Sequence, residues 1–197
     1  MSLIRYQPHI DGLRAVAVLL VILHHLGDWA ATRGGYVGVD VFFVISGFLI
    51  TSIIRKELEA GTCTFGGFYK RRVIRLAPAY FTVLLATTIA AVLWMLPAEL
   101  LGYARSMAAS SLFLANFHMW KEIGDYFGAE AHTAPLLHLW SLAVEEQFYL
   151  FWPVALLLGH RLLGNRRMPW VVGAVAIAGV LASQWGVARY PAAAYYL

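Results

Sequence analysis

The chain has 197 residues, of which 60% are hydrophobic and only 13% are charged. Soluble globular domains are close to half apolar and a quarter charged, so this composition argues against a soluble domain and indicates a chain whose solvent is lipid. The formal net charge of +4 is too small to indicate a nucleic-acid partner. The single cysteine, Cys63, can form no intrachain disulfide, and no cysteine cluster suggests a metal site.

Five apolar stretches approach the roughly 20 residues that a helix needs to cross a hydrocarbon core. They cover residues 10–29, 35–54, 76–96, 136–158 and 170–187. A weaker stretch, 100–117, contains Arg105 and Asn116 and could be a poor span, a re-entrant segment or an interfacial helix. The sequence therefore predicts an all-α fold, a polytopic bundle of transmembrane helices.

Lysine and arginine near the ends of the spans set their orientation, because cytoplasmic loops are enriched in both. Residues 55–75 hold six of them, and residues 161–167 hold three. Both segments are expected in the cytoplasm, together with the N-terminus. This arrangement requires that the stretch 100–117 does not cross the membrane fully, and it places residues 118–135 outside.

An ionisable residue inside a membrane helix costs at least a few kcal/mol, so each is a candidate for function. Arg14 and His25 are eleven residues apart, which is about 20° off three full turns and puts both on one stripe. Asp11 can pair with Arg14, whereas His24 points about 100° away from His25. Alternatively, Asp11 and Arg14 anchor the helix end and His25 is a packing residue.

The fourth apolar stretch carries two adjacent carboxylates, Glu145 and Glu146. At helical spacing, His138, Ser141, Glu145 and Tyr149 line one face. Two carboxylates within a membrane need protons, cations or water. In the alternative interpretation the helix starts later and the pair lies at the interface.

Two further charged features have a structural and a functional interpretation. Asp40 lies within the second stretch, and we interpret it as a structural partner for a cation of the first helix in preference to a catalytic group. A basic string, 70–75, precedes the third span, as topology alone would require. However, Arg72 and Arg75 share a helical face, and a guanidinium fork matches phosphate oxygens, so an anion site is equally open.

Four strings follow one another along the chain: IDGLRAVAVLL at 10–20 with His25 after it, GYVGVDVFFVISGFLIT at 35–51, FYKRRVIR at 68–75 and LHLWSLAVEEQFY at 137–149. Together they resemble the acyltransferase-3 family of membrane O-acyltransferases, which modify bacterial surface polysaccharides and related acceptors. The family pattern of Arg, ten residues, then His matches Arg14 and His25. Its Arg-x-x-Arg pattern matches Arg72 and Arg75, and the first carboxylate of its glutamate motif matches Glu145.

The resemblance implies an acyl donor such as acetyl-CoA, used as a co-substrate and not permanently bound. Arg71, Arg72 and Arg75 would meet the phosphates of coenzyme A. His25 would act as the general base, or carry the acyl group, for a hydroxyl of a carbohydrate or lipid-linked glycan. Asp11, Arg14 and Glu145 would orient groups or stabilise charge.

The resemblance also bears on location and length. It implies an integral protein of the bacterial inner membrane, with the lipid bilayer and the glycan as partners. The family domain has more transmembrane helices than this chain supplies, so residues 1–197 are expected to be the N-terminal portion of a membrane acyltransferase domain. The alternatives are a transporter or flippase, in which the same charges form a substrate path, and a non-catalytic assembly subunit.

Overall fold

A computed structural model describes residues 7–26, 34–124 and 133–197. Within these ranges the chain forms eight α-helices and no strand, which confirms the predicted all-α class. The chain divides into two compact units, Met1–Cys63 and Thr64–Leu197. The end of the first predicted span and residues 125–132 of the segment 118–135 lie outside the described residues.

The first unit is a pair of antiparallel helices, α1 (Pro8–Leu26) and α2 (Val37–Glu59). Two glycines let their backbones approach closely. A Cβ atom added at Gly38 would lie 2.5 Å from the carbonyl oxygen of Ala17, and one added at Gly35 would lie 2.8 Å from Cβ of His24. Small residues at such a crossing are typical of helix pairs in membranes, where close backbone packing replaces the hydrophobic driving force.

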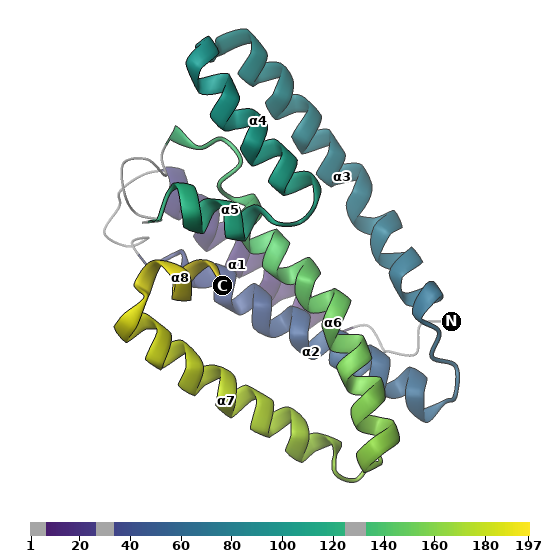
Figure 1. Cartoon of the computed structure of the whole chain (residues 1–197). Coiled ribbons are helices and arrows are strands. Elements are labelled where there is room, and N and C mark those ends of the chain that lie inside the picture. The colour runs from purple at the N-terminus through teal and green to yellow at the C-terminus, as the bar shows by residue number, and fades with distance from the viewer. Residues whose placement is uncertain (1–6, 27–33, 125–132) are drawn as a thin grey trace. The chain divides into compact units, whose positions relative to one another are not determined.

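The second unit begins with α3 (Phe65–Trp94), along which α4 (Pro97–Ser111) returns (Figure 1). The hydroxyl of Tyr80 on α3 donates a hydrogen bond to the backbone carbonyl of Ser110. Nearer the tip of the pair, the hydroxyls of Thr88 and Tyr103 are 2.8 Å apart. These polar contacts hold α4 against α3.

The remaining helices of this unit are α5 (Ala115–Glu122), α6 (Leu139–Leu163), α7 (Met168–Arg189) and α8 (Pro191–Tyr196). The short helix α8 folds back from the end of α7 and packs against α5 and α6 (Figure 1). Its Tyr196 is fully buried, and the rings of Tyr195 and Tyr196 lie 4.9 and 5.6 Å from that of Trp140 on α6. Three aromatic side chains therefore pack together at the start of α6.

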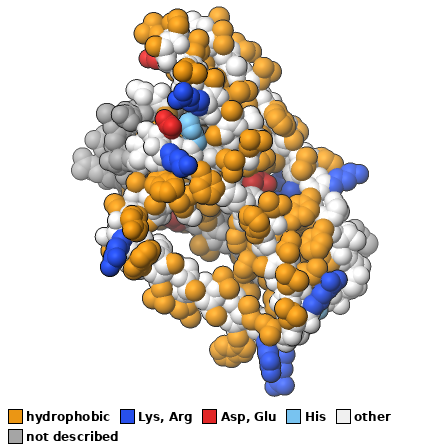
Figure 2. Space-filling view, viewed as in Figure 1, with side chains coloured by type: hydrophobic (Ala, Val, Ile, Leu, Met, Phe, Trp, Pro, Cys, Tyr) orange, Lys and Arg blue, Asp and Glu red, His pale blue; other side chains and the backbone are white. Residues whose placement is uncertain are grey.

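Five of the described helices, α1, α2, α3, α6 and α7, are long and apolar enough to cross a membrane. Their apolar side chains are largely exposed: Trp94 is 80% and Leu162 is 79% accessible. Figure 2 shows hydrophobic side chains spread over the viewed face, with lysine and arginine in separate clusters. An apolar surface of this extent is stable only in lipid or against further protein. The predicted spans are confirmed, and the chain is an integral membrane protein.

The weak sixth stretch, 100–117, forms the beginning of α5 and most of α4, which has 15 residues. At 1.5 Å per residue it is about 22 Å long, shorter than a hydrocarbon core of about 30 Å. A turn and the short helix α5 follow it. This length agrees with the arrangement in which the stretch does not cross fully, which stays a prediction.

One sequence-based expectation was wrong. The basic string 70–75 was expected in a loop, but α3 begins at Phe65 and contains the whole string. No proline interrupts the helix before Pro78. Within this string, Arg72 contacts an aromatic ring of α6, whereas Lys70, Arg71 and Arg75 are exposed.

Candidate functional site

The polar stripe on α1 has the predicted contacts at its beginning. Nη1 of Arg14 lies 3.9 Å from Oδ1 of Asp11, and both side chains are partly exposed. Asp40 on α2 is exposed and forms no ion pair within the described residues, so the predicted partnership with a cation of the first helix is not seen there. The charge of Arg14 is instead matched by Asp11 on its own helix.

His25, near the end of α1, has a defined ring orientation. Its Nδ1 lies 2.8 Å from the backbone carbonyl oxygen of Val21. Because a carbonyl can only accept a hydrogen bond, Nδ1 must carry the proton. In the neutral imidazole the lone pair is then on Nε2, which is the atom a general base would use.

The neighbouring histidine has a different environment. The ring of His24 lies 5.9 Å from that of Tyr36, next to the start of α2, and Cβ of His24 faces Gly35. His25 is exposed on the surface of this helix pair. Helical rotation therefore gives His24 the packing position and leaves His25 accessible, as the stripe on α1 predicts.

In the second unit, Arg72 on α3 lies over an aromatic ring of α6. Its Cζ is 3.6 Å from the centre of the Tyr149 ring, a cation–π distance. The hydroxyl of the same tyrosine donates a hydrogen bond to Oε1 of Glu145, one turn earlier on α6. Tyr149 is 4% exposed, so a buried ring connects the guanidinium to the carboxylate.

A second contact fixes α3 and α6 at the same level. The hydroxyl of Tyr69, almost one turn before Arg72, donates a 2.8 Å hydrogen bond to the backbone carbonyl of Leu150. Tyr149 and Leu150 lie near the middle of α6, which has 25 residues. The guanidinium of Arg72 therefore lies beside the middle of α6, and it does not lie in a surface loop as the sequence suggested.

The other basic side chains of the string have different positions. Arg71 and Arg75 are exposed, whereas Arg72 is half-buried. Arg72 also interacts electrostatically with Glu146, and Glu146 interacts in turn with the charge of Glu145. The cluster consequently contains both adjacent carboxylates, although the family resemblance singles out Glu145.

Gln147, the residue after the carboxylate pair, has a structural role. Its Nε2 donates hydrogen bonds to the backbone carbonyl of Phe113 at 2.8 Å and to Oδ1 of Asn116 at 2.9 Å. Asn116 is 1% exposed, and Phe113 has a φ of 55° and stacks on Tyr80. These bonds hold the turn between α4 and α5 against α6, close to the carboxylates.

The contact between Arg72 and Tyr149 could not be read from the sequence. Tyr149 was placed on the face of Glu145, and the structure confirms that these two meet. His138 precedes the helix, at its N-cap, and is exposed. Among the described residues, no group of three histidine, cysteine or acidic side chains could hold a metal ion.

Residues 8–197 match a protein family described as an acyltransferase domain. The chain belongs to this family. The resemblance seen in the four sequence strings is thereby confirmed, and it covers all the candidate residues in both units.

Several named proteins are similar to this chain. It is 38% identical over 200 residues to the peptidoglycan O-acetyltransferase OatA of Listeria monocytogenes. The matched region covers 98% of this chain and 31% of that protein. It is 44% identical over 165 residues to a protein of Bacillus subtilis provisionally named a peptidoglycan O-acetyltransferase, covering 82% of this chain and 25% of the relative. A provisionally named O-acetyltransferase of Staphylococcus aureus is 42% identical over 153 residues, 77% of this chain and 25% of its own length.

The chain thus spans between a quarter and a third of the length of these curated relatives. No solved structure matches it significantly.

Proposed function

We propose that the protein to which this chain belongs transfers an acyl group, in the first instance acetyl, from acyl-CoA to a hydroxyl of a cell-wall or surface glycan. The observation that carries the proposal is membership of the acyltransferase family over residues 8–197. The names of the relatives in Listeria and Bacillus suggest peptidoglycan as the first acceptor to test. The bacterial inner membrane is the proposed location, since a cytoplasmic donor and an external glycan meet there.

The donor would be bound by the basic side chains of α3. Arg71 and Arg75 are exposed and can meet the phosphates of coenzyme A. Arg72 is less exposed than these two residues, and its guanidinium stacks by one face on the ring of Tyr149. A guanidinium that stacks by its face keeps its in-plane N–H donors for an anion, and within the described part of the chain these donors make no hydrogen bond.

The acceptor would be activated by His25. In this step Nε2 takes the proton of the glycan hydroxyl, whose oxygen attacks the carbonyl carbon of the thioester. The C–O bond forms, the C–S bond breaks, and the thiolate of coenzyme A leaves and is protonated. The bond from Nδ1 to Val21 holds the ring in the tautomer that this role requires. Arg14, paired with Asp11, and Glu145 would orient groups or stabilise the developing charge.

The test uses the full-length protein in proteoliposomes with isotope-labelled acetyl-CoA and a soluble peptidoglycan fragment. Mass spectrometry of the glycan is expected to show a new acetyl ester that mild alkali removes. A transporter would move its substrate across the vesicle membrane and leave it chemically unchanged. Movement of label without any ester would therefore overturn the proposal in favour of transport.

A further inference from the structure

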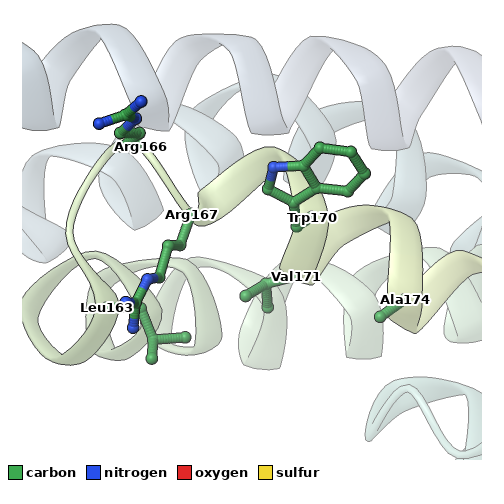
Figure 3. A pocket seen from close by; sticks show the side chains of 6 residues that line it. All are labelled: Leu163, Arg166, Arg167, Trp170, Val171 and Ala174. Atoms are coloured by element: carbon green, nitrogen blue, oxygen red, sulfur yellow. The ribbon is translucent and has the colours of Figure 1, made fainter.

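The loop between α6 and α7 borders a pocket of about 660 Å³ that the proposed reaction does not use. Six residues line it: Leu163, Arg166, Arg167, Trp170, Val171 and Ala174. In Figure 3 the side chain of Arg167 runs beside Leu163, at the end of α6, and the indole of Trp170 projects from the first turn of α7.

The position of the pocket along the helices fixes its environment. The helix α6 ends at Leu163 and α7 begins at Met168, and both are apolar enough to cross a membrane. The four residues between them must turn the chain at a membrane surface. The pocket consequently opens at the level of the lipid headgroups, with its helical walls entering the acyl-chain region.

The lining divides into charged and apolar parts. Arg166 and Arg167 supply two positive charges, and no acidic residue lines the pocket. Neither arginine forms an ion pair within the ranges that the structure describes. The walls are formed by Leu163, Val171 and Ala174, and Trp170 is 81% exposed at the rim.

We propose that this pocket binds the headgroup phosphate of an anionic phospholipid. Guanidinium groups match phosphate oxygens, and basic pockets between membrane helices are known to bind anionic headgroups. Volumes of about 300–1,000 Å³ suit molecules much larger than an inorganic ion, so a free phosphate would leave most of the space empty. The apolar wall instead accepts the beginning of the acyl chains, and an exposed indole is favourable at this level of a bilayer.

Membrane topology alone would also produce a basic loop here, without any specific lipid site. Arg161 distinguishes a specific site from a general attraction of positive charge to anionic lipid. It lies in the last turn of α6, is exposed, and does not line the pocket. A general attraction between positive loops and anionic lipid would involve Arg161 as much as Arg166 or Arg167. A specific pocket would involve only the latter two.

Native mass spectrometry of the full-length protein in detergent, titrated with phosphatidylglycerol or phosphatidylcholine, measures binding of single lipids. The wild-type protein is expected to prefer phosphatidylglycerol. Replacing both pocket arginines (R166A with R167A) is expected to lower that affinity by about 30-fold. Arg161→Ala, the matched control, should change it by less than about threefold, because that side chain lies outside the pocket and is screened by solvent.

A variant that preserves the charge and a soluble competitor serve as controls. The double lysine variant, R166K with R167K, preserves the charge and is expected to fold, but it should recover only part of the affinity because lysine lacks the bidentate fork. Soluble glycerol phosphate should not displace the lipid, because it makes no contact with the apolar wall. Equal losses in Arg161→Ala and the double alanine variant, or full displacement by glycerol phosphate, would overturn the lipid site.

Discussion

Cζ of Arg72 lies 3.6 Å from the centre of the Tyr149 ring, and the hydroxyl of that ring donates a hydrogen bond to Glu145. One side chain of α6 thus contacts a cation on α3 by its face and an anion on its own helix by its edge. The ring and the hydroxyl of Tyr149 contact different neighbours, so the two contacts can be removed separately.

Tyr149→Phe and Tyr149→Leu are therefore expected to differ. Phenylalanine keeps the ring beneath Arg72, so the KM for acetyl-CoA should stay near the wild-type value while kcat falls through the loss of the bond to Glu145. Leucine removes the ring as well, and a lost cation–π contact should raise KM by about 2- to 30-fold. Steady-state kinetics of the full-length protein measures both constants. Identical kinetics for the two variants would contradict the division of roles.

Arg72→Ala is expected to weaken coenzyme A binding more than Arg75→Ala, because Arg72 is held in place by Tyr149 whereas Arg75 is exposed. Arg72→Lys should restore only part of the binding, since lysine lacks the planar fork. Isothermal titration of the full-length protein with coenzyme A gives the affinities directly, without turnover. Unchanged affinity in all three variants would assign the basic string to membrane topology alone.

His25→Ala is expected to lower the rate of ester formation by about a hundredfold or more, the usual contribution of a general base. His24→Ala should keep most of the activity per folded molecule but lower the thermal midpoint, because His24 packs beside Gly35 and Tyr36. An ester-forming assay and a thermal melt of the same samples separate the two effects. Normal turnover in a folded His25→Ala protein would exclude the proposed base.

Gly38→Ala tests the close crossing of α1 and α2. The new methyl group would overlap the backbone of Ala17, and overpacking of this kind costs about 1–3 kcal/mol. Gly12→Ala is the matched control, since nothing lies within 4 Å of its added Cβ and alanine favours a helix over glycine. Thermal unfolding of the full-length protein in detergent should show a lower midpoint for Gly38→Ala only. A similar loss in both variants would indicate a general intolerance of α1 and α2 to substitution.

The proposed orientation is tested by labelling with an impermeant thiol reagent on intact cells, in a Cys63→Ser background. Cysteines at Thr62 and Asn165 are expected to stay unlabelled, because the basic segments around them should face the cytoplasm. A cysteine at Glu122, an exposed position of α5, should be labelled from outside. Outside labelling at Thr62 or Asn165 would reverse the orientation or require α4 to cross the membrane.

The sequence by itself determined the all-α class, the five spans and the family, because apolar length and local motifs are properties of consecutive residues. It also separated His25 from His24, since helical rotation depends only on spacing. It placed the basic string in a loop because charge is normally excluded from a span, and this was wrong. Only the tertiary structure showed that Tyr149 and Tyr69 join α3 to α6, so that Arg72 has a partner on another helix. Contacts between residues more than seventy positions apart depend on how the helices pack, and no local pattern in either helix encodes them.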